Sequence, residues 1–158
     1  MSDEGLARSR FDLDSSAGFW LGIAYRKVST LLLHRIADFD VTPEQWSVLY
    51  RIGEQDGQIQ KDIAERSGKD KPTTTRILDA LEAKGFIEKR PGENDRRSFR
   101  IFLTEKGKKA RERIAPIEYD TIRDATAGMT AEEYAMLLRM LRRISDNADG
   151  LLSELKKE

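Results

Sequence analysis

The strongest constraint on the fold lies between Gln58 and Gly107, where the spacing of apolar residues changes at Gly85 from helical to alternating. Apolar residues three or four positions apart share one face of a helix, whereas alternating ones share one face of a strand. The stretch therefore predicts two short helices followed by a two-stranded hairpin, the order of a helix-turn-helix motif with a wing. Such a helix can enter the major groove of DNA while the hairpin reaches the minor groove.

A sharp turn at Ser67-Gly68 separates the two predicted helices. Glycine adopts the left-handed backbone that ends many helices, so the chain can turn there without strain. Asp70 is the expected N-cap of the second helix, and Pro72 falls in its first turn, where proline is accepted. The apolar stripe of the first helix is Ile59, Ile63 and Ala64, and that of the second is Thr74, Ile77, Leu78 and Leu81.

The outward face of the second helix carries the predicted DNA contacts. Hydroxyl and methyl groups of threonine can meet base edges or phosphates, while lysine and arginine supply positive charge near the DNA backbone. These contacts are Lys71, Pro72, Thr73, Thr75 and Arg76. The alternative is that three consecutive threonines only begin a helix, but β-branched residues are poor helix formers and their run needs another reason.

Beyond Gly85 the alternation predicts a hairpin. Residues 86–90 and 98–103 are its strands, and residues 91–95 contain the proline, glycine, asparagine and aspartate that favour a turn. One face of the second strand is Phe99, Ile101 and Leu103, and the other is Ser98, Arg100 and Phe102.

The tip of this hairpin carries Asp95, Arg96 and Arg97. Arginine at such a tip can push its guanidinium into a narrow minor groove, where the negative potential is strongest. We expect the carboxylate of Asp95 to orient Arg97 rather than cancel its charge. The alternative is a solvated charged turn, in which an exposed ion pair contributes only about 0–1 kcal/mol.

Four short motifs follow one another in this region. They are Asp62-Ile63-Ala64-Glu65-Arg66-Ser67-Gly68, Thr73-Thr74-Thr75-Arg76-Ile77-Leu78-Asp79-Ala80-Leu81-Glu82-Ala83-Lys84-Gly85-Phe86-Ile87, Asp95-Arg96-Arg97 and Leu103-Thr104-Glu105-Lys106-Gly107. In this order and spacing they resemble the MarR family of winged-helix transcriptional regulators, and the resemblance extends from about Phe19 to Leu155. Pro72 and Thr74 depart from it, because Ser and Val are more usual there, and this bears on base preference rather than on the fold.

The resemblance implies an obligate homodimer that binds a pseudo-palindromic operator in double-stranded DNA. It also implies a repressor relieved by a small, often aromatic, ligand. By the same resemblance Arg97 is the minor-groove residue and Asp95 is its partner.

Composition indicates one soluble, mainly helical domain. The chain has 158 residues, of which 39% are hydrophobic and 35% are charged. No apolar run is long enough to cross a membrane, and the polar first residues do not resemble a signal peptide, so we expect a cytoplasmic protein. The absence of cysteine agrees with that compartment, although it is weak support.

The net charge of zero, from 28 basic and 28 acidic residues, is unevenly distributed along the chain. From Lys84 to Arg113 there are eleven Lys or Arg and five Asp or Glu, a net charge of +6, and the remainder carries −6. A local basic surface is what binding to phosphates requires. For Lys106, Lys108, Lys109, Arg111 and Arg113, DNA contact and a merely solvated helix remain equal alternatives.

Long amphipathic helices flank the predicted DNA-binding part. Thr42 and Gln45 form a capping-box-like start to a helix that turns Trp46, Leu49 and Ile52 inward. The helix before it has the stripe Phe19, Ile23, Ala24, Val28, Leu31, Leu32, Ile36 and Phe39.

The C-terminal part predicts two more helices. Thr104 caps one that continues to about Ala127, with Pro116 kinking or interrupting it. Thr130 begins a capping box for the other, in which Gly150 is a weak point. The stripe of this last helix is Tyr134, Leu137, Leu141, Ile144, Ala148, Leu151 and Leu155, widened by Leu138 and Leu152. A stripe of that length needs a partner helix, so we predict a dimerisation module.

The fold class is therefore mainly α (α+β): a winged helix-turn-helix DNA-binding domain with N- and C-terminal helices that form a dimerisation domain. The predicted parts are a flexible N-terminus at residues 1–14, a dimerisation helix at 15–40, the winged domain at 42–107 and completing helices at 108–158. Within the winged domain the recognition helix spans about 71–84 and the wing about 86–103.

No constellation for catalysis or for a metal is predicted. The single histidine, His34, is expected to be structural, and without cysteine a zinc site or a thiol nucleophile cannot be assembled from the usual ligands. We therefore predict no enzyme activity, no cofactor and no metal. Trp20, Tyr25 and Trp46 are candidate walls of an effector site, with Arg26 or His34 as a polar contact, although aromatic residues at helical spacing more often belong to a core.

Two classes of function remain compatible with the sequence. The first is a dimeric DNA-binding regulator, and the second is a winged-helix module that docks a protein and does not read DNA. Arg97 discriminates between them, because its loss would lower the salt dependence of binding only if the wing enters a DNA groove.

Overall fold

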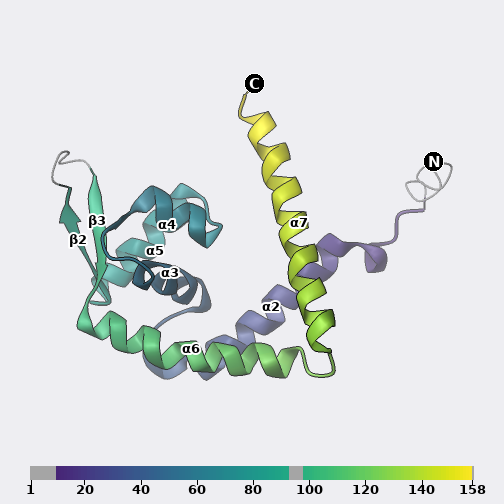
Figure 1. The fold of residues 1–158 in the computed structure, drawn as a ribbon, viewed down its shortest axis with the longest axis horizontal. Coiled ribbons are helices and arrows are strands. Elements are labelled where there is room, and N and C mark those ends of the chain that lie inside the picture. Colours follow the sequence, from purple (N-terminus) through teal and green to yellow (C-terminus); the bar gives the residue numbers. More distant parts are fainter. Residues whose placement is uncertain (1–9, 93–97, 158) are drawn as a thin grey trace. The chain divides into compact units, whose positions relative to one another are not determined.

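The computed structural model describes residues 10–92 and 98–157. Over these residues the chain is mainly helical with one small antiparallel sheet, which confirms the predicted fold class (Figure 1). The helices are α2 (Ala17–Arg35), α3 (Pro43–Gly53), α4 (Gln60–Ser67), α5 (Lys71–Ala83), α6 (Glu105–Ala125) and α7 (Ala131–Leu155), and the short 3₁₀ turns are η1 (Leu13–Ser15) and η2 (Ala37–Phe39). The chain divides into two compact units, Met1–Thr121 and Ile122–Glu158.

The sheet contains the predicted hairpin and one additional strand. Its order is β1 (Gln58–Ile59), β3 (Phe99–Leu103) and β2 (Ile87–Pro91), and both pairings are antiparallel. Ile87 pairs with Leu103, and this register turns Ile101 and Leu103 into the core, as predicted. Phe99 shares their face but is exposed near the end of the hairpin. The tip residues Asp95, Arg96 and Arg97 lie outside the described residues.

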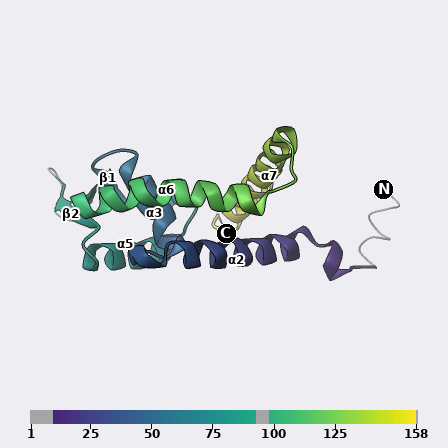
Figure 2. The same cartoon turned by 90° about the horizontal axis from the view of Figure 1, so that it is seen from below.

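Helix α3 forms the centre of the first unit. In both ribbon views α3 lies between α5 and α6 (Figures 1 and 2). Trp46, Leu49 and Ile52 are buried on it, as predicted from the sequence. The core around α3 also contains Leu32, Ile36, Val41, Ile63, Ile77, Leu78, Leu81, Phe86, Ile87, Ile101, Leu103, Ala110 and Ile114. The helices α3 to α5, the sheet and the start of α6 therefore share one hydrophobic core.

Three helix starts confirm the predicted caps. Thr42 and Thr130 each form a complete capping box with the residue three positions later. The side chain of Asp70 accepts a hydrogen bond of 2.8 Å from the backbone N–H of Thr73. At the predicted turn Gly68 has a φ of +65°, the left-handed conformation that glycine adopts most readily. These local signals fix where the helices begin and end.

Two expectations about element boundaries are wrong, and one of two alternatives at Pro116 is excluded. Ile59 lies in β1, so the first short helix begins one residue later, at Gln60. The apolar stripe of the N-terminal helix predicts that it reaches Phe39, but α2 ends at Arg35 and is followed by η2 and by Asp40 with a φ of +58°. Of the kink or interruption expected at Pro116, the interruption does not occur, because α6 continues through this residue. Because Pro116 is exposed, water can bind the carbonyl group that loses its helical donor.

Helix α7 carries an apolar stripe that is half-buried at Leu137 and Leu141 and exposed from Ile144 onward. None of its 25 residues is buried, although the predicted stripe at spacings of three and four is present. Leu151 and Leu155 are 64% and 67% exposed. Among the described residues no helix has the length and hydropathy to cross a membrane.

Candidate nucleic-acid interface

Helix α5 separates a buried face from an exposed one at its N-terminal end. Thr74, Ile77, Leu78 and Leu81 are buried, which confirms the predicted stripe. Of the predicted DNA contacts, Lys71, Pro72, Thr75 and Arg76 are exposed and Thr73 is half-buried. The first two turns of α5 therefore offer two cations and a threonine to solvent from a rigidly packed helix.

The threonine hydroxyls of this segment bond within the protein. Thr74 Oγ1 donates to the carbonyl oxygen of Asp70 at 2.8 Å, and Thr75 Oγ1 donates to that of Lys71 at 3.0 Å. Gln60, at the start of α4, donates from Nε2 to Thr75 Oγ1. Thr74 and Thr75 thus stabilise the first turn of α5, in line with the alternative that the threonines begin a helix. The link from Thr75 to α4 is a contact that the sequence pattern did not reveal.

The N-cap carboxylate is held in its charged form. The backbone N–H of Thr73, and then its hydroxyl, lower the pKa of Asp70 below the ordinary value of 3.8. A carboxylate at this end also complements the positive end of the helix dipole. Asp70 therefore belongs to the support of α5, while the neighbouring Lys71 remains exposed.

Arg76 faces another helix as well as solvent. Its guanidinium lies 3.7 Å from the carboxylate of Glu44 on α3, and both side chains are largely exposed. An exposed ion pair at that distance contributes little to stability. Arg76 is therefore available to a stronger partner, such as a phosphate or a ligand carboxylate.

The C-terminal end of α5 is tied to the turn between α2 and α3. Lys84 Nζ donates to the carbonyl oxygen of Asp40 at 2.9 Å and to Gln45 Oε1 at 3.0 Å. The carbonyl oxygen of Lys84 accepts a hydrogen bond of 2.6 Å from Lys106 Nζ at the start of α6. Lys84, the residue that follows α5, thus connects this helix to the turn before α3, to α3 itself and to the start of α6.

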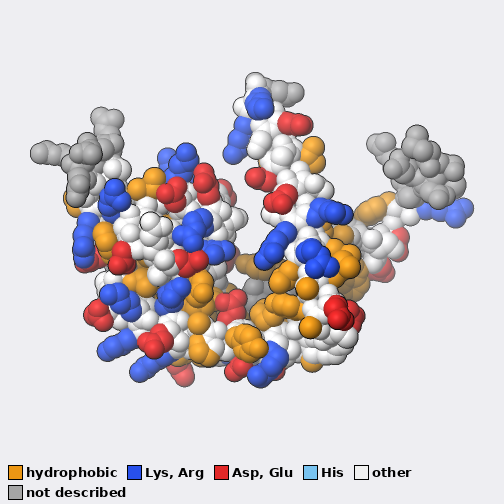
Figure 3. All heavy atoms as spheres, viewed as in Figure 1, with side chains coloured by type: hydrophobic (Ala, Val, Ile, Leu, Met, Phe, Trp, Pro, Cys, Tyr) orange, Lys and Arg blue, Asp and Glu red, His pale blue; other side chains and the backbone are white. Residues whose placement is uncertain are grey.

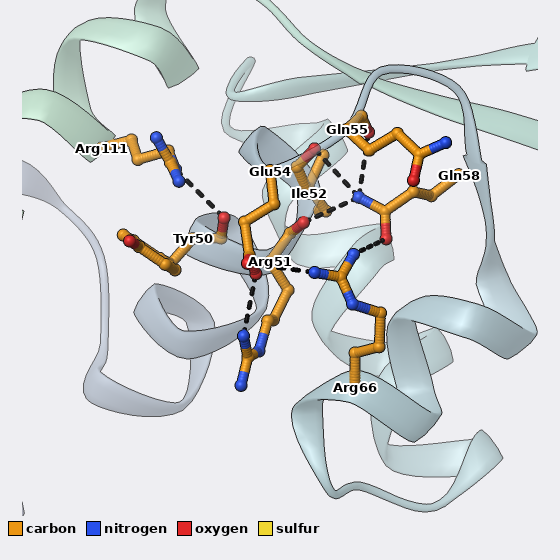
Figure 4. A network of polar contacts seen from close by, with 8 residues as sticks. All are labelled: Tyr50, Arg51, Ile52, Glu54, Gln55, Gln58, Arg66 and Arg111. Carbon is orange, nitrogen blue, oxygen red and sulfur yellow. Dashed lines mark hydrogen bonds and ion pairs between the residues drawn. The ribbon is translucent and has the colours of Figure 1, made fainter.

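A network around Gln58 joins the end of α3 to α4 (Figure 4). The Nε2 of this buried side chain donates to the carbonyl oxygens of Arg51, Ile52 and Gln55, and its Oε1 accepts from Arg66 at 2.7 Å. These carbonyls belong to the last turn of α3 and the residues after it, where helical donors run out. The side-chain amide therefore caps α3 and orients α4 at the same time.

Glu54 extends this network toward solvent. Its carboxylate lies 2.9 Å from the guanidinium of Arg51 and 3.0 Å from that of Arg66 (Figure 4). The hydrogen bond from Arg51 lowers the pKa of Glu54 below its ordinary value. Both arginines are therefore committed to the fold rather than to a ligand.

The base of the wing is fixed to α5 and to its own sheet. Lys89 Nζ on β2 lies 2.7 Å from Asp79 on α5, and the guanidinium of Arg90 stacks 4.1 Å from the ring centre of Phe102. Figure 3 shows basic and acidic side chains interspersed over the visible face of this part of the chain. On that face positive charge sits on individual side chains rather than in a continuous patch.

Two of the basic residues of α6 are engaged by the fold. Lys106 Nζ lies 4.5 Å from the ring centre of Phe86. Arg111 stacks 4.1 Å from the ring centre of Tyr50 and donates from Nε to the carbonyl oxygen of that residue at 3.0 Å (Figure 4). For these two cations the structure gives a packing role, whereas Lys108, Lys109 and Arg113 are exposed, with Lys108 3.4 Å from Glu105.

A hollow of about 460 Å³ lies between α2, α3 and α5, and we call it the α2–α3–α5 hollow. Of the candidate effector residues, Tyr25 lines it together with Arg26. Its walls also include Ser29, Thr30, Leu33, Thr42, Pro43, Glu44, Gln45, Arg76, Ile77 and Ala80. Arg76 and Ile77 belong to α5, so an occupant of this hollow would contact that helix directly.

The other candidate aromatic residues lie elsewhere. Trp20 is half-exposed on α2 and donates from Nε1 to the carbonyl oxygen of Asp14 at 2.6 Å. Trp46 is 3% exposed within the core and donates from Nε1 to Glu118. His34 is exposed on α2 and is not among the residues that line the hollow.

Residues 41–99 match the family model described as MarR family. Over 137 residues the chain is 31% identical to the uncharacterized HTH-type transcriptional regulator YybA of Bacillus subtilis (strain 168), a match that covers 87% of this chain and 91% of that protein.

Two solved structures share the fold over most of the chain. A probable transcriptional regulator from Pseudomonas aeruginosa matches with a TM-score of 0.78 and 26% identity, covering 84% of this chain and 99% of the other. A mutant MarR from E. coli, in complex with operator DNA, matches with a TM-score of 0.74 and 27% identity, covering 80% and 91%.

Proposed function

The chain belongs to the MarR family, and from this we propose that it is a dimeric, sequence-specific regulator that represses transcription from a pseudo-palindromic DNA operator. The observation that carries this proposal is α5, whose apolar face is buried while Lys71, Thr75 and Arg76 are exposed on its first two turns. The similar E. coli protein forms a complex with operator DNA. We also propose that the protein acts in the cytoplasm.

Asp95, Arg96 and Arg97 complete the proposed DNA-binding residues, together with Pro72 and Thr73. The two strands that lead to the tip are fixed by Lys89 and by pairing with the neighbouring strand, so the wing starts from a rigid base. We propose that Arg97 enters the minor groove and that Asp95 orients it.

Helix α7 supports the proposed dimer. Exposed apolar stripes of this length mark an interaction surface, because leaving them in water forfeits about 25 cal/mol per Å² of apolar area. A second copy of the chain carries the same apolar stripe and can therefore cover the first. We propose that residues 15–40 and 108–158 form this dimerisation domain, which sets two recognition helices about one turn of DNA apart.

The α2–α3–α5 hollow supports relief by a small ligand. Arg26 and Arg76 line it together with Tyr25, so it combines positive charge with an aromatic wall. This lining suits an aromatic acid, whose carboxylate can pair with a guanidinium while its ring contacts apolar side chains. We propose that such a ligand weakens DNA binding by engaging the recognition helix.

Footprinting of the purified protein on its own upstream DNA, with and without aromatic acids, tests this function. Protection of two half-sites by a particle of twice the chain mass is the expected result, and release by one of the acids would identify an effector. Protection that persists with every acid tried would contradict the ligand proposal alone. A monomer, or a protein that ignores DNA at low ionic strength, would contradict the whole proposal.

Arg97→Ala separates a DNA-reading wing from a protein-docking one. Loss of one DNA contact per protomer should weaken operator binding and lower the salt slope by about one per wing. Lys157→Ala, a cation in the last residues of the chain, is the matched control and should leave the slope unchanged. An unchanged slope for both variants would favour the winged module that docks a protein.

A further inference from the structure

Two of the three consecutive threonines of α5, Thr74 and Thr75, use their hydroxyl protons within the protein. A hydroxyl carries a single proton. In Thr74 it bonds to the carbonyl oxygen of Asp70 at 2.8 Å, and in Thr75 to that of Lys71 at 3.0 Å. The segment therefore cannot donate from these hydroxyls to a base or a phosphate without giving up a bond that stabilises its own first turn.

Thr75 is the exposed member of this run, and its oxygen is engaged twice. Besides donating to Lys71, Thr75 Oγ1 accepts a hydrogen bond from Nε2 of Gln60 on α4. These two bonds, to the preceding turn and to the neighbouring helix, fix the oxygen of the side chain. With its proton and one of its two lone pairs engaged, the hydroxyl can no longer donate to a base edge, whereas the Cγ2 methyl group remains the apolar group that the exposed side chain offers there.

In the major groove the C5 methyl group is an apolar feature that thymine alone among the four bases presents. A threonine methyl makes apolar contact with it, whereas a threonine hydroxyl could bond to several base edges. We infer that Thr75 is a specificity-determining residue that reads thymine through its methyl group, with Gln60 holding its hydroxyl away from the DNA. This inference rests on the proposed function, because it presupposes that α5 enters the major groove.

The test compares methyl removal on the DNA with methyl removal on the protein. A duplex is first selected from a randomised pool by the wild-type protein, and each thymine is then replaced in turn by deoxyuridine, which lacks only the C5 methyl. At one position in each half-site the replacement should raise Kd about fourfold at fixed salt, the factor for burying one methyl-sized group.

Two conservative variants then assign that effect to Thr75. Thr75→Val keeps a methyl at Cγ2 and should retain the fourfold response to deoxyuridine, although its overall affinity can change. Thr75→Ser keeps the hydroxyl and loses the methyl, and should bind the thymine and deoxyuridine duplexes equally. The matched control is Thr126→Ser, just after α6, whose hydroxyl makes the same kind of bond, to the carbonyl oxygen of Ile122 at 2.7 Å, and which should respond like the wild type.

Each contrary outcome has a separate meaning. A selected duplex in which no thymine is sensitive to deoxyuridine would overturn the inference, and this result needs no variant. The inference would also be overturned if Thr75→Ser stayed as sensitive as the wild type, or if Thr75→Val lost the response. A pool that yields no enriched duplex would overturn the proposed function and the inference with it.

Discussion

The ammonium group of Lys84 lies 2.9 Å from the carbonyl oxygen of Asp40 and 3.5 Å from its carboxylate. Lys84 is the residue that follows α5, and Asp40 occupies the left-handed turn between η2 and α3. This contact joins the end of α5 to the turn that separates the N-terminal helix α2 from α3. The position of α5 is therefore set from both ends, by Asp70 at its start and by Lys84 at its finish.

Lys84→Met should lower the free energy of unfolding by about 1 kcal/mol. The variant keeps much of the aliphatic stem but leaves the carbonyl oxygen of Asp40 and the amide oxygen of Gln45 without their charged donor. Urea denaturation measures the change. The control is Lys109→Met, an exposed lysine of α6, and equal losses in the two variants would contradict a specific role for Lys84.

Gln58→Leu should be more severe, with a loss of about 2–3 kcal/mol. The substitution leaves three backbone carbonyls and the guanidinium of Arg66 without their buried partner, which costs more than the loss of one exposed hydrogen bond. Gln55→Leu is the matched control, because that side chain is exposed and its backbone carbonyl serves the network. Thermal or urea denaturation that ranks Gln55→Leu as the worse variant would contradict this account.

Gly107→Ala tests the close approach of α6 to the start of the wing. A Cβ atom at this position would lie 2.1 Å from the carbonyl oxygen of Phe86, which is backbone and cannot swing aside. We expect a loss of about 1–3 kcal/mol from the forced displacement. Gly22→Ala, inside α2 with open space around the added methyl group, should instead stabilise the helix by about 0.5–1 kcal/mol. Differential scanning calorimetry of both variants checks the opposite signs.

Asp70 should make stability depend on pH in the acid range. Its pKa is lower in the folded chain than the ordinary 3.8, because its carboxylate accepts the N–H and hydroxyl of Thr73. The contribution is therefore fully present above the unfolded-state pKa and is lost as the pH falls through the folded-state value.

Asp70→Asn isolates this effect, because asparagine caps a helix without titrating. Relative to this variant, the wild type should lose stability as the pH is lowered below 3.8, as measured by urea denaturation at a series of pH values. Asp146→Asn, an exposed substitution within α7, serves as the control. A wild-type to Asp70→Asn difference that stays constant with pH would contradict the role of the carboxylate.

Local patterns in the sequence predicted the elements that hold the interface. The stripe from Thr74 to Leu81 and the alternation from Phe99 to Leu103 each report burial directly, because side-chain direction follows from the helical or strand period. Thr42, Asp70 and Thr130 were recognisable as caps because a cap acts over three residues. The MarR family, the fold and the exposed positions at the start of α5 could therefore be anticipated.

Contacts between distant residues could not be predicted in the same way. Gln58 has no neighbours in sequence that signal its burial, and Lys84 reaches Asp40 only after the helices have packed. The end of α2 at Arg35 also escaped prediction, since apolar spacing continues through Ile36 and Phe39 while the backbone turns. Of the three aromatic effector candidates, Tyr25 alone lines the α2–α3–α5 hollow. The sequence could not single it out, because aromatic character does not distinguish a pocket wall from a core position.

The guanidinium of Arg76 is placed where it can contact either a DNA phosphate or a ligand in the α2–α3–α5 hollow. It projects from the outward face of α5 and also lines the α2–α3–α5 hollow beside Glu44. Under the proposed function, an acid in the hollow and a phosphate on the operator compete for the same cation. Thermodynamic reciprocity then requires that saturating operator lower the affinity for the acid by the same factor by which the acid weakens the operator complex.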